Sequence, residues 1–312
     1  MEPWNCETIT YMNIYNQISS NKWRTWLIMT LFIVFITTIG FVFGKASGYG
    51  LSFAGLALIL AGFMSFFSYY YSDKLVLASV RAKEIHKKDN PQLFNIVQNL
   101  TIGDGLPMPK IYIMDTDAPN AFATGRDPQH GIVCVTRGLL DRLNKAELEG
   151  VLAHELSHVK NFDTRLMGIV AILVGFVAIL ANIFMQQLWW GGFRSRDERD
   201  NGGNIQAIFL VIGVVFAILS PIIATLIQLA ISRKREFLAD ASGALLTRYP
   251  EGLAEALEKI AKYKAPMPQV SNATAQLFIE NPFTGKDFGG WFSSLFDTHP
   301  PIAERIKILR SM

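Results

Sequence analysis

The sequence is poor in cysteine, in histidine and in net charge. It has two cysteines, Cys6 and Cys134, and no CxxC pair, which excludes a disulfide framework and a cysteine-rich structural zinc site. The formal net charge of +3 is small, and no basic stripe with interleaved aromatic residues occurs, so no nucleic-acid partner is expected. No cleavable signal peptide is evident, because the first apolar run begins only at Thr25 and is better explained as an anchor.

Long uncharged runs are abundant instead. Half of the 312 residues are hydrophobic, and four runs contain no Asp, Glu, Lys, Arg or His: 25–43, 49–71, 166–190 and 205–231. Spanning the hydrocarbon core of a bilayer takes roughly 20 residues, and each run is about that long or longer. The sequence therefore predicts a membrane protein with four transmembrane helices in two hairpins.

Positive charges predict the orientation of these hairpins. Lys and Arg are frequent in the segment that opens at Asp73, and Arg233, Lys234 and Arg235 directly follow the fourth run. Lys and Arg beside the spans mark the cytoplasmic side. Both termini and the 73–165 segment are therefore expected in the cytoplasm.

The remaining segments predict a small α+β domain, so the expected fold class is a mainly α membrane protein carrying such a domain. Lys110–Met114 and Gly131–Thr136 are short, rich in β-branched residues and typical of strands, whereas Pro, Asn and Gly in 118–127 are expected to break regular structure. Helices are expected over 91–101, twice within 137–162, over 234–247 and 251–262, and near 300–310. The second helix within 137–162 is expected to have Asn144 as its N-cap and Glu147 at position N3.

The segment His154-Glu155-Leu156-Ser157-His158 contains an HExxH motif on a predicted helix. Two histidines four residues apart lie on one helical face, so both imidazoles can bind a single zinc ion. Glu155 is offset from them and can reach a water on the metal, which is the place of a general base. With five histidines in the chain, a chance match is rare, and the motif predicts one catalytic Zn²⁺ per chain.

The third zinc ligand must come from elsewhere, because no further histidine follows His158 closely. Glu236 is the favoured candidate. Asp240, one helical turn later, is placed to accept a hydrogen bond from a ligand histidine. Alone, this segment would suggest a solvated helix with Glu236 paired to nearby basic residues. HExxH precedes the third apolar run and Glu236 follows the fourth, so a short hairpin brings them to one side of the membrane.

At this point the chain resembles the HtpX-type membrane metallopeptidases, relatives of the CAAX prenyl proteases. The resemblance covers nearly the whole chain and includes the segments HELSH at 154–158, NAFATG at 120–125, SRKREFLAD at 232–240 and THPP at 298–301, with Arg305. It implies a bacterial inner-membrane location, stress-related proteolysis of damaged membrane proteins, and His154, His158 and Glu236 as zinc ligands with Glu155 as general base. It further implies that Asn120, Ala121 and Phe122 belong to an edge strand that pairs with the substrate backbone.

Other residues have weaker signals. His299 is either a donor to the oxyanion of the reaction intermediate or an ordinary turn histidine. Arg305 either pairs with Asp240 or another carboxylate, or is a plain helical arginine. The aromatic residues within 278–296 cover the active site, contact the membrane interface or fill the soluble core.

These observations predict a membrane-integrated zinc endopeptidase acting on polypeptides, membrane proteins above all, at the cytoplasmic face. The expected domains are 1–72 with the first hairpin, 73–165 with the HExxH helix, 166–231 with the second hairpin, and 232–312 with the third ligand. Two alternatives stay open: a CAAX-type protease of narrow specificity, and a non-catalytic membrane adaptor with a structural zinc site.

Overall fold

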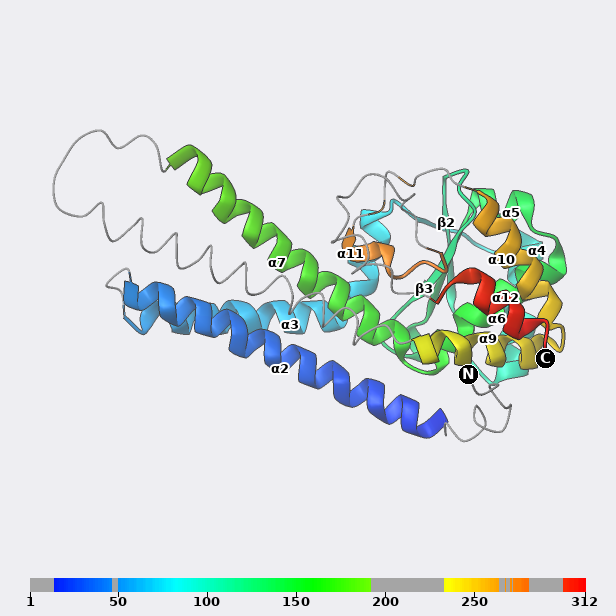
Figure 1. Ribbon diagram of the computed structural model, residues 1–312, viewed down its shortest axis with the longest axis horizontal. Helices are drawn as coiled ribbons and strands as arrows, with labels where there is room; N and C mark the ends of the chain where they lie inside the picture. Colours follow the sequence, from blue (N-terminus) through cyan, green and yellow to red (C-terminus); the bar gives the residue numbers. More distant parts are fainter. Residues whose placement is uncertain are drawn as a thin grey trace.

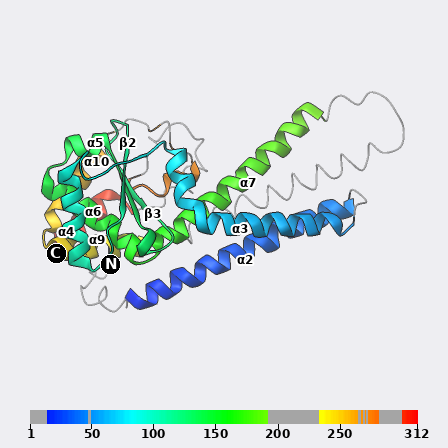
Figure 2. The same ribbon diagram turned by 180° about the vertical axis from the view of Figure 1, so that it is seen from behind.

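The computed structural model describes residues 14–46, 50–191, 233–263, 267, 270, 272–280 and 300–312. Three long helices project from one side of an α+β domain, as both views show (Figure 1, Figure 2). The long helices are α2 (Ile14–Ala46), α3 (Ser52–Ser79) and α7 (Asp163–Gly191). The domain contains β1 (Lys83–Glu84), α4 (Pro91–Asp104), β2 (Lys110–Met114), β3 (Ala121–Thr124), η1 (Pro128–His130), β4 (Ile132–Thr136), α5 (Arg137–Arg142), α6 (Lys145–Lys160), α9 (Arg233–Thr247), α10 (Pro250–Lys262), α11 (Asn272–Ala275) and α12 (Ile302–Leu309).

The three long helices contain stretches that are apolar and long enough to cross a membrane: Gln17–Lys45, Ser52–Ser79 and Asp163–Leu180. They agree with the first three predicted spans, although each helix extends beyond its apolar run. The fourth predicted span and the loop before it lie outside the described residues. Many large apolar side chains of α3 face outward, among them Ile59 and Phe63, as a lipid-facing surface requires.

Small residues allow these helices to pack closely. A Cβ added to Gly40 of α2 would lie 2.4 Å from Cβ of Ala57 on α3. One added to Gly168 of α7 would lie 3.2 Å from the Ser72 hydroxyl of α3. Such contacts are typical of membrane helix interfaces, where small residues let backbones approach. The helices α2 and α3 therefore pack as one bundle with α7, and α7 follows directly on the α+β domain.

The sheet has the order β1-β2-β4-β3, with β2 and β4 parallel and the outer pairs antiparallel. The two predicted strands are confirmed as β2 and β4. The expectation of irregular structure throughout 118–127 was wrong, because Ala121–Thr124 forms β3 in register with β4. Side chains alternate between the faces, so Val133 packs in the α6 core while Cys134 packs in the core shared with α3 and α7.

The helix α6 carries the HExxH motif and lies on the sheet beneath α9 and α10. Its start is fixed by the predicted capping box, in which Asn144 accepts from the Glu147 N–H and the Glu147 side chain accepts from the Asn144 N–H. A Cβ added to Gly243 of α9 would lie 3.1 Å from the backbone nitrogen of His154. The backbone of α9 therefore runs directly against the centre of the motif.

The chain breaks sharply between α6 and α7. Phe162 takes a left-handed conformation with φ 61°, which is unfavourable for a residue with a side chain. This turn ends α6 and starts α7 at Asp163, only five residues after His158. The first carboxylate of the membrane helix is thereby brought back toward the HExxH face.

Candidate metal centre

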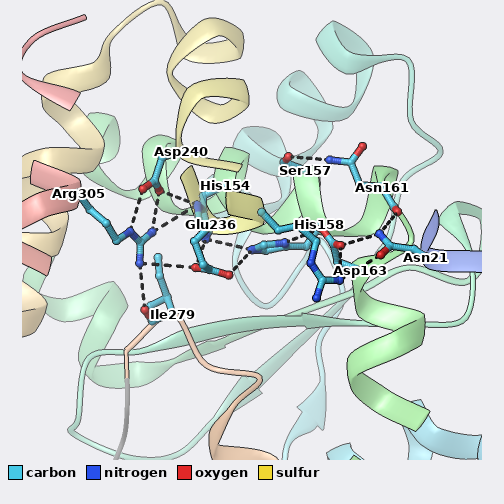
Figure 3. A network of polar contacts seen from close by, with 11 residues as sticks. Asn21, His154, Ser157, His158, Asn161, Asp163, Glu236, Asp240, Ile279 and Arg305 are labelled. Atoms are coloured by element: carbon cyan, nitrogen blue, oxygen red, sulfur yellow. Dashed lines mark hydrogen bonds and ion pairs between the residues drawn. The ribbon is translucent and has the colours of Figure 1, made fainter. Parts of the chain in front are cut away.

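His154 and His158 lie one turn apart on α6 and direct ring nitrogens to a common point (Figure 3). Their Nε2 atoms are 3.2 Å apart. Both residues are buried, at 1% and 7% exposure. Two imidazole nitrogens at this separation, sharing one burial site, are the donor arrangement that zinc prefers in proteins.

Glu236 supplies a third donor from α9. Its carboxylate oxygens lie 3.7 Å from Nε2 of His154 and 3.5 Å from Nε2 of His158. One ligand atom from each of the three residues lies within 4.8 Å of the other two. The structure thus brings together the three residues that the sequence and the resemblance single out, across a long separation in the chain.

Each histidine has a carboxylate behind it, on the nitrogen that faces away from the centre. Oδ1 of Asp240 lies 2.9 Å from Nδ1 of His154, and Oδ2 of Asp163 lies 3.1 Å from Nδ1 of His158. Such partners hold the proton on Nδ1 and leave the Nε2 lone pair directed to the centre. Asp240 is the carboxylate predicted for this position from its spacing to Glu236, whereas Asp163 was missed, because its approach depends on the turn at Phe162.

Arg305 of α12 is fully buried against this site. Its Nε and Nη2 donate to the two oxygens of Asp240 at 2.8 and 2.7 Å, and its Nη1 lies 3.8 Å from Glu236. Burial alone would raise the pKa of Asp240, but Arg305 and His154 outweigh it and lower this pKa to about 2. Of the alternatives for Arg305, the structure therefore has the pairing with Asp240.

Glu155 is buried beside the centre and faces the sheet. The backbone N–H of Ala123 on β3 is near its carboxylate and favours the charged form. Burial raises its pKa to about 7, with the Glu236 charge adding to the rise and His158 opposing it. A buried carboxyl with a pKa near neutrality can take up and release a proton at physiological pH.

The two histidines differ in their proton affinity. Burial lowers the pKa of His154. It acts on His158 in the same direction, but the hydrogen bond that its ring donates to Asp163 and the charges of Glu236 and Asp163 outweigh it and raise the pKa of His158 to about 9. Asp163 therefore raises the proton affinity of His158, whereas burial dominates at His154.

The predicted substrate-binding segment lies at the edge of the sheet. In the described sheet β3 is an edge strand, and residues 278–279 contact part of its free edge. The Ile279 N–H donates to the Ala121 carbonyl at 3.0 Å, and Phe278 forms a β-bridge with Phe122. The Asn120 side chain donates to the Glu280 carbonyl at 3.0 Å. Phe278 is buried in the core that the sheet shares with the long helices α2, α3 and α7. His299 and the other aromatic residues of 281–296 lie outside the described residues.

A family model of peptidase family M48 matches residues 87–312, which are most of the chain and include every residue of the centre described above. The chain belongs to peptidase family M48. This confirms the predicted metallopeptidase family, and the three apolar helices agree with a membrane-bound M48 peptidase.

The relatives of this M48 peptidase confirm the resemblance to the HtpX type. The chain is 44% identical over 301 residues to a "Protease HtpX homolog" of Thermoanaerobacter pseudethanolicus, covering 96% of this chain and 98% of the relative. It is 45% identical over 299 residues to one of Tropheryma whipplei strain Twist, with the same coverage. Among solved structures, the crystal structure of S. mikatae Ste24p is 19% identical, with a TM-score of 0.49 over 92% of this chain and 66% of that chain.

Proposed function

We propose that this protein is a zinc endopeptidase that hydrolyses peptide bonds at the cytoplasmic face of a bacterial inner membrane. One observation carries the proposal: donor atoms of His154, His158 and Glu236 lie within 4.8 Å of one another, with Glu155 buried beside them. Three protein ligands leave a position for water and substrate, as catalytic zinc sites do.

The residues present fit a zinc ion by their chemistry. Two imidazoles and one carboxylate form a donor set found in zinc peptidases, and each imidazole has a carboxylate on its far nitrogen. When bound, zinc supplies Lewis acidity, which polarises the scissile carbonyl and makes water a nucleophile near neutral pH. A purely structural site usually has four protein ligands, often cysteines, and this argues against the adaptor alternative.

Proton transfer is assigned to Glu155. As a general base it takes a proton from the attacking water, and as a general acid it then gives that proton to the nitrogen of the leaving amine. Its burial keeps competing water away, and the nearby backbone N–H of Ala123 on β3 favours its charged carboxylate. The substrate backbone is proposed to lie along this same strand.

The outer edge of β3 is the proposed substrate platform. An extended peptide can add to a sheet edge through backbone hydrogen bonds. Asn120, Ala121 and Phe122 are proposed to take part, as the resemblance implies. Because Ile279 and Glu280 bond to Asn120 and Ala121, a substrate strand must either replace those bonds or pair beyond them, toward Ala123. His299 remains a proposed donor to the oxyanion.

The membrane layout suggests the class of substrate. The long helices leave the α+β domain close to the centre, since α7 begins five residues after His158. Four spans, including 205–231, and cytoplasmic termini are proposed from the apolar runs and the positive charges. An active site this close to the bilayer suits damaged membrane proteins, and quality control of such proteins is the proposed role.

The deciding experiment uses purified protein in detergent, stripped with chelator and then supplied with zinc. Wild type is expected to cleave an unfolded reporter such as casein, whereas Glu155→Gln is expected to bind one equivalent of zinc and cleave nothing. Full activity of Glu155→Gln would refute the assignment. Adding a prenylated peptide and an unfolded membrane protein as parallel substrates separates broad proteolysis from CAAX-type specificity.

A further inference from the structure

A polar residue of the first membrane helix reaches the metal centre. Asn21 lies on α2, within the apolar stretch Gln17–Lys45, and is 1% exposed. A buried amide is costly unless its donors and its acceptor are satisfied. The partners of Asn21 lie 140, 142 and 214 positions away along the chain, so the contact is purely tertiary.

Asn21 uses both ends of its amide. Its Nδ2 donates to Oδ1 of Asp163 at 2.7 Å and to the carbonyl of Asn161 at 2.9 Å. Its Oδ1 accepts from Nη1 of Arg235 at 3.1 Å (Figure 3). A side-chain amide is the neutral group that can donate to a carboxylate and accept from a guanidinium at once.

These contacts hold the carboxylate that orients His158. Arg235 also donates to Oδ1 of Asp163, at 3.0 Å. With two donors on Oδ1, the other oxygen of Asp163 remains directed to Nδ1 of His158, at 3.1 Å. The Nε2 of His158 then faces His154 and Glu236. The carboxylate of Asp163 cannot rotate without breaking the bonds to Asn21 and Arg235.

His154 has a parallel arrangement, which among the described residues involves none from the long helices α2, α3 and α7. His154 contacts Asp240, and Arg305 binds both oxygens of Asp240. Both halves of the centre are thus His–Asp–Arg arrays, one with Arg305 of α12 and the other with Arg235 of α9, to which α2 adds Asn21. A bidentate arginine fixes a carboxylate plane, whereas at Asp163 two donors from different helices, Arg235 and Asn21, converge on one oxygen.

We propose that Asn21 is a positioning residue for His158, so that the first membrane helix is part of the metal centre as well as an anchor. This inference rests on the zinc site proposed above. The first hairpin then orients a metal ligand in addition to anchoring the protein. Removing the Asn21 amide weakens metal binding and turnover without preventing membrane insertion.

The test is Asn21→Leu, which keeps the branched shape and the number of side-chain heavy atoms, suits a membrane helix and removes every side-chain hydrogen bond. Zinc affinity is measured by competition with a chromophoric chelator in detergent. We expect zinc binding to be about tenfold weaker, in the range found for changes to the partners of ligand histidines. The change in kcat should be larger than the change in KM. The matched control is Ser68→Ala, another buried polar residue of the bundle, whose hydroxyl contacts Ile169; it should leave zinc affinity unchanged.

A double-mutant cycle with Asp163→Asn separates positioning from general destabilisation. If Asn21 acts through Asp163, the double variant binds zinc no more weakly than Asp163→Asn alone, because the effects are coupled. Additive losses, or wild-type affinity in Asn21→Leu, would overturn the inference even if the enzyme proves active. Absence of zinc binding and cleavage in wild type would instead overturn the proposed function. Circular dichroism of each metal-free variant confirms that folded protein is compared.

Discussion

Arg305 holds Asp240 by both carboxylate oxygens, at 2.8 and 2.7 Å, and Asp240 in turn lies 2.9 Å from Nδ1 of His154. All three side chains are at most 1% exposed. A charge at this depth is tolerated because its partner is present. The C-terminal helix α12 is therefore needed by the metal centre.

Arg305→Ala is expected to be strongly destabilising. It leaves the Asp240 carboxylate buried without its guanidinium, and such a loss costs about 3–5 kcal/mol. Thermal unfolding in detergent should show a clearly lower Tm. Arg310→Ala is the control, because Arg310 lies at the end of the same helix but pairs with Glu251 and Glu258 at the surface. A similar fall in Tm for both variants would contradict this explanation.

Zinc removal should lower stability, and Glu236 should be required for the effect. A ligand that binds only the folded state stabilises it by about 4 kcal/mol at a thousand times its Kd. Chelator is therefore expected to lower the Tm of wild type and of Glu155→Gln, which retains the three proposed ligands. Glu236→Gln should have a low Tm with or without zinc. A zinc-dependent Tm in Glu236→Gln would show that the third ligand lies elsewhere.

Gly243→Ala should disturb the centre through the backbone. The added Cβ would lie 3.1 Å from the nitrogen of His154, so α9 and α6 must separate slightly. Overpacking of this kind costs about 1–3 kcal/mol, and here it also moves Glu236 relative to His154. Tm and zinc affinity should both fall. Gly62→Ala is the comparison, because a Cβ at Gly62 meets nothing within 4 Å; it should preserve both quantities.

Cys134 should be chemically inert in the folded protein. It is 1% exposed, and burial raises the pKa of its thiol, so little reactive thiolate forms. In a Cys6→Ser background, a maleimide probe is expected to label Cys134 slowly in detergent and quickly in guanidinium. Rapid labelling of the native protein would mean that the core between the sheet and the membrane helices opens readily.

Features set by neighbouring residues were predictable from the sequence. The HExxH helix and the cap at Asn144 depend on contacts within one or two turns, and the long apolar runs indicated α2, α3 and α7. The strands β2 and β4 were predicted because their segments are short, rich in β-branched residues and bounded by turn residues. The composition of Ala121–Thr124 carries no such signal, and this segment is a strand because β4 pairs with it.

Of the two carboxylates that contact the ligand histidines, only one could be predicted from the sequence. Asp240 follows Glu236 by one helical turn, so its place could be inferred from spacing. Asp163 reaches His158 only because Phe162 adopts a left-handed turn. Asn21 precedes the first apolar run, and nothing in its surroundings indicates that its partners follow more than a hundred residues later. Such long-range contacts need the folded structure.

The centre is divided along the chain, with His154 and His158 before the membrane helix α7 and Glu236 after it. During synthesis the histidine half leaves the ribosome first, and the glutamate follows only when α7 and the residues up to 232 have been made. A nascent chain that already displays HELSH therefore lacks a complete metal site. We therefore expect proteolytic activity to appear only after the last helices have folded. An incompletely synthesised chain would be inactive.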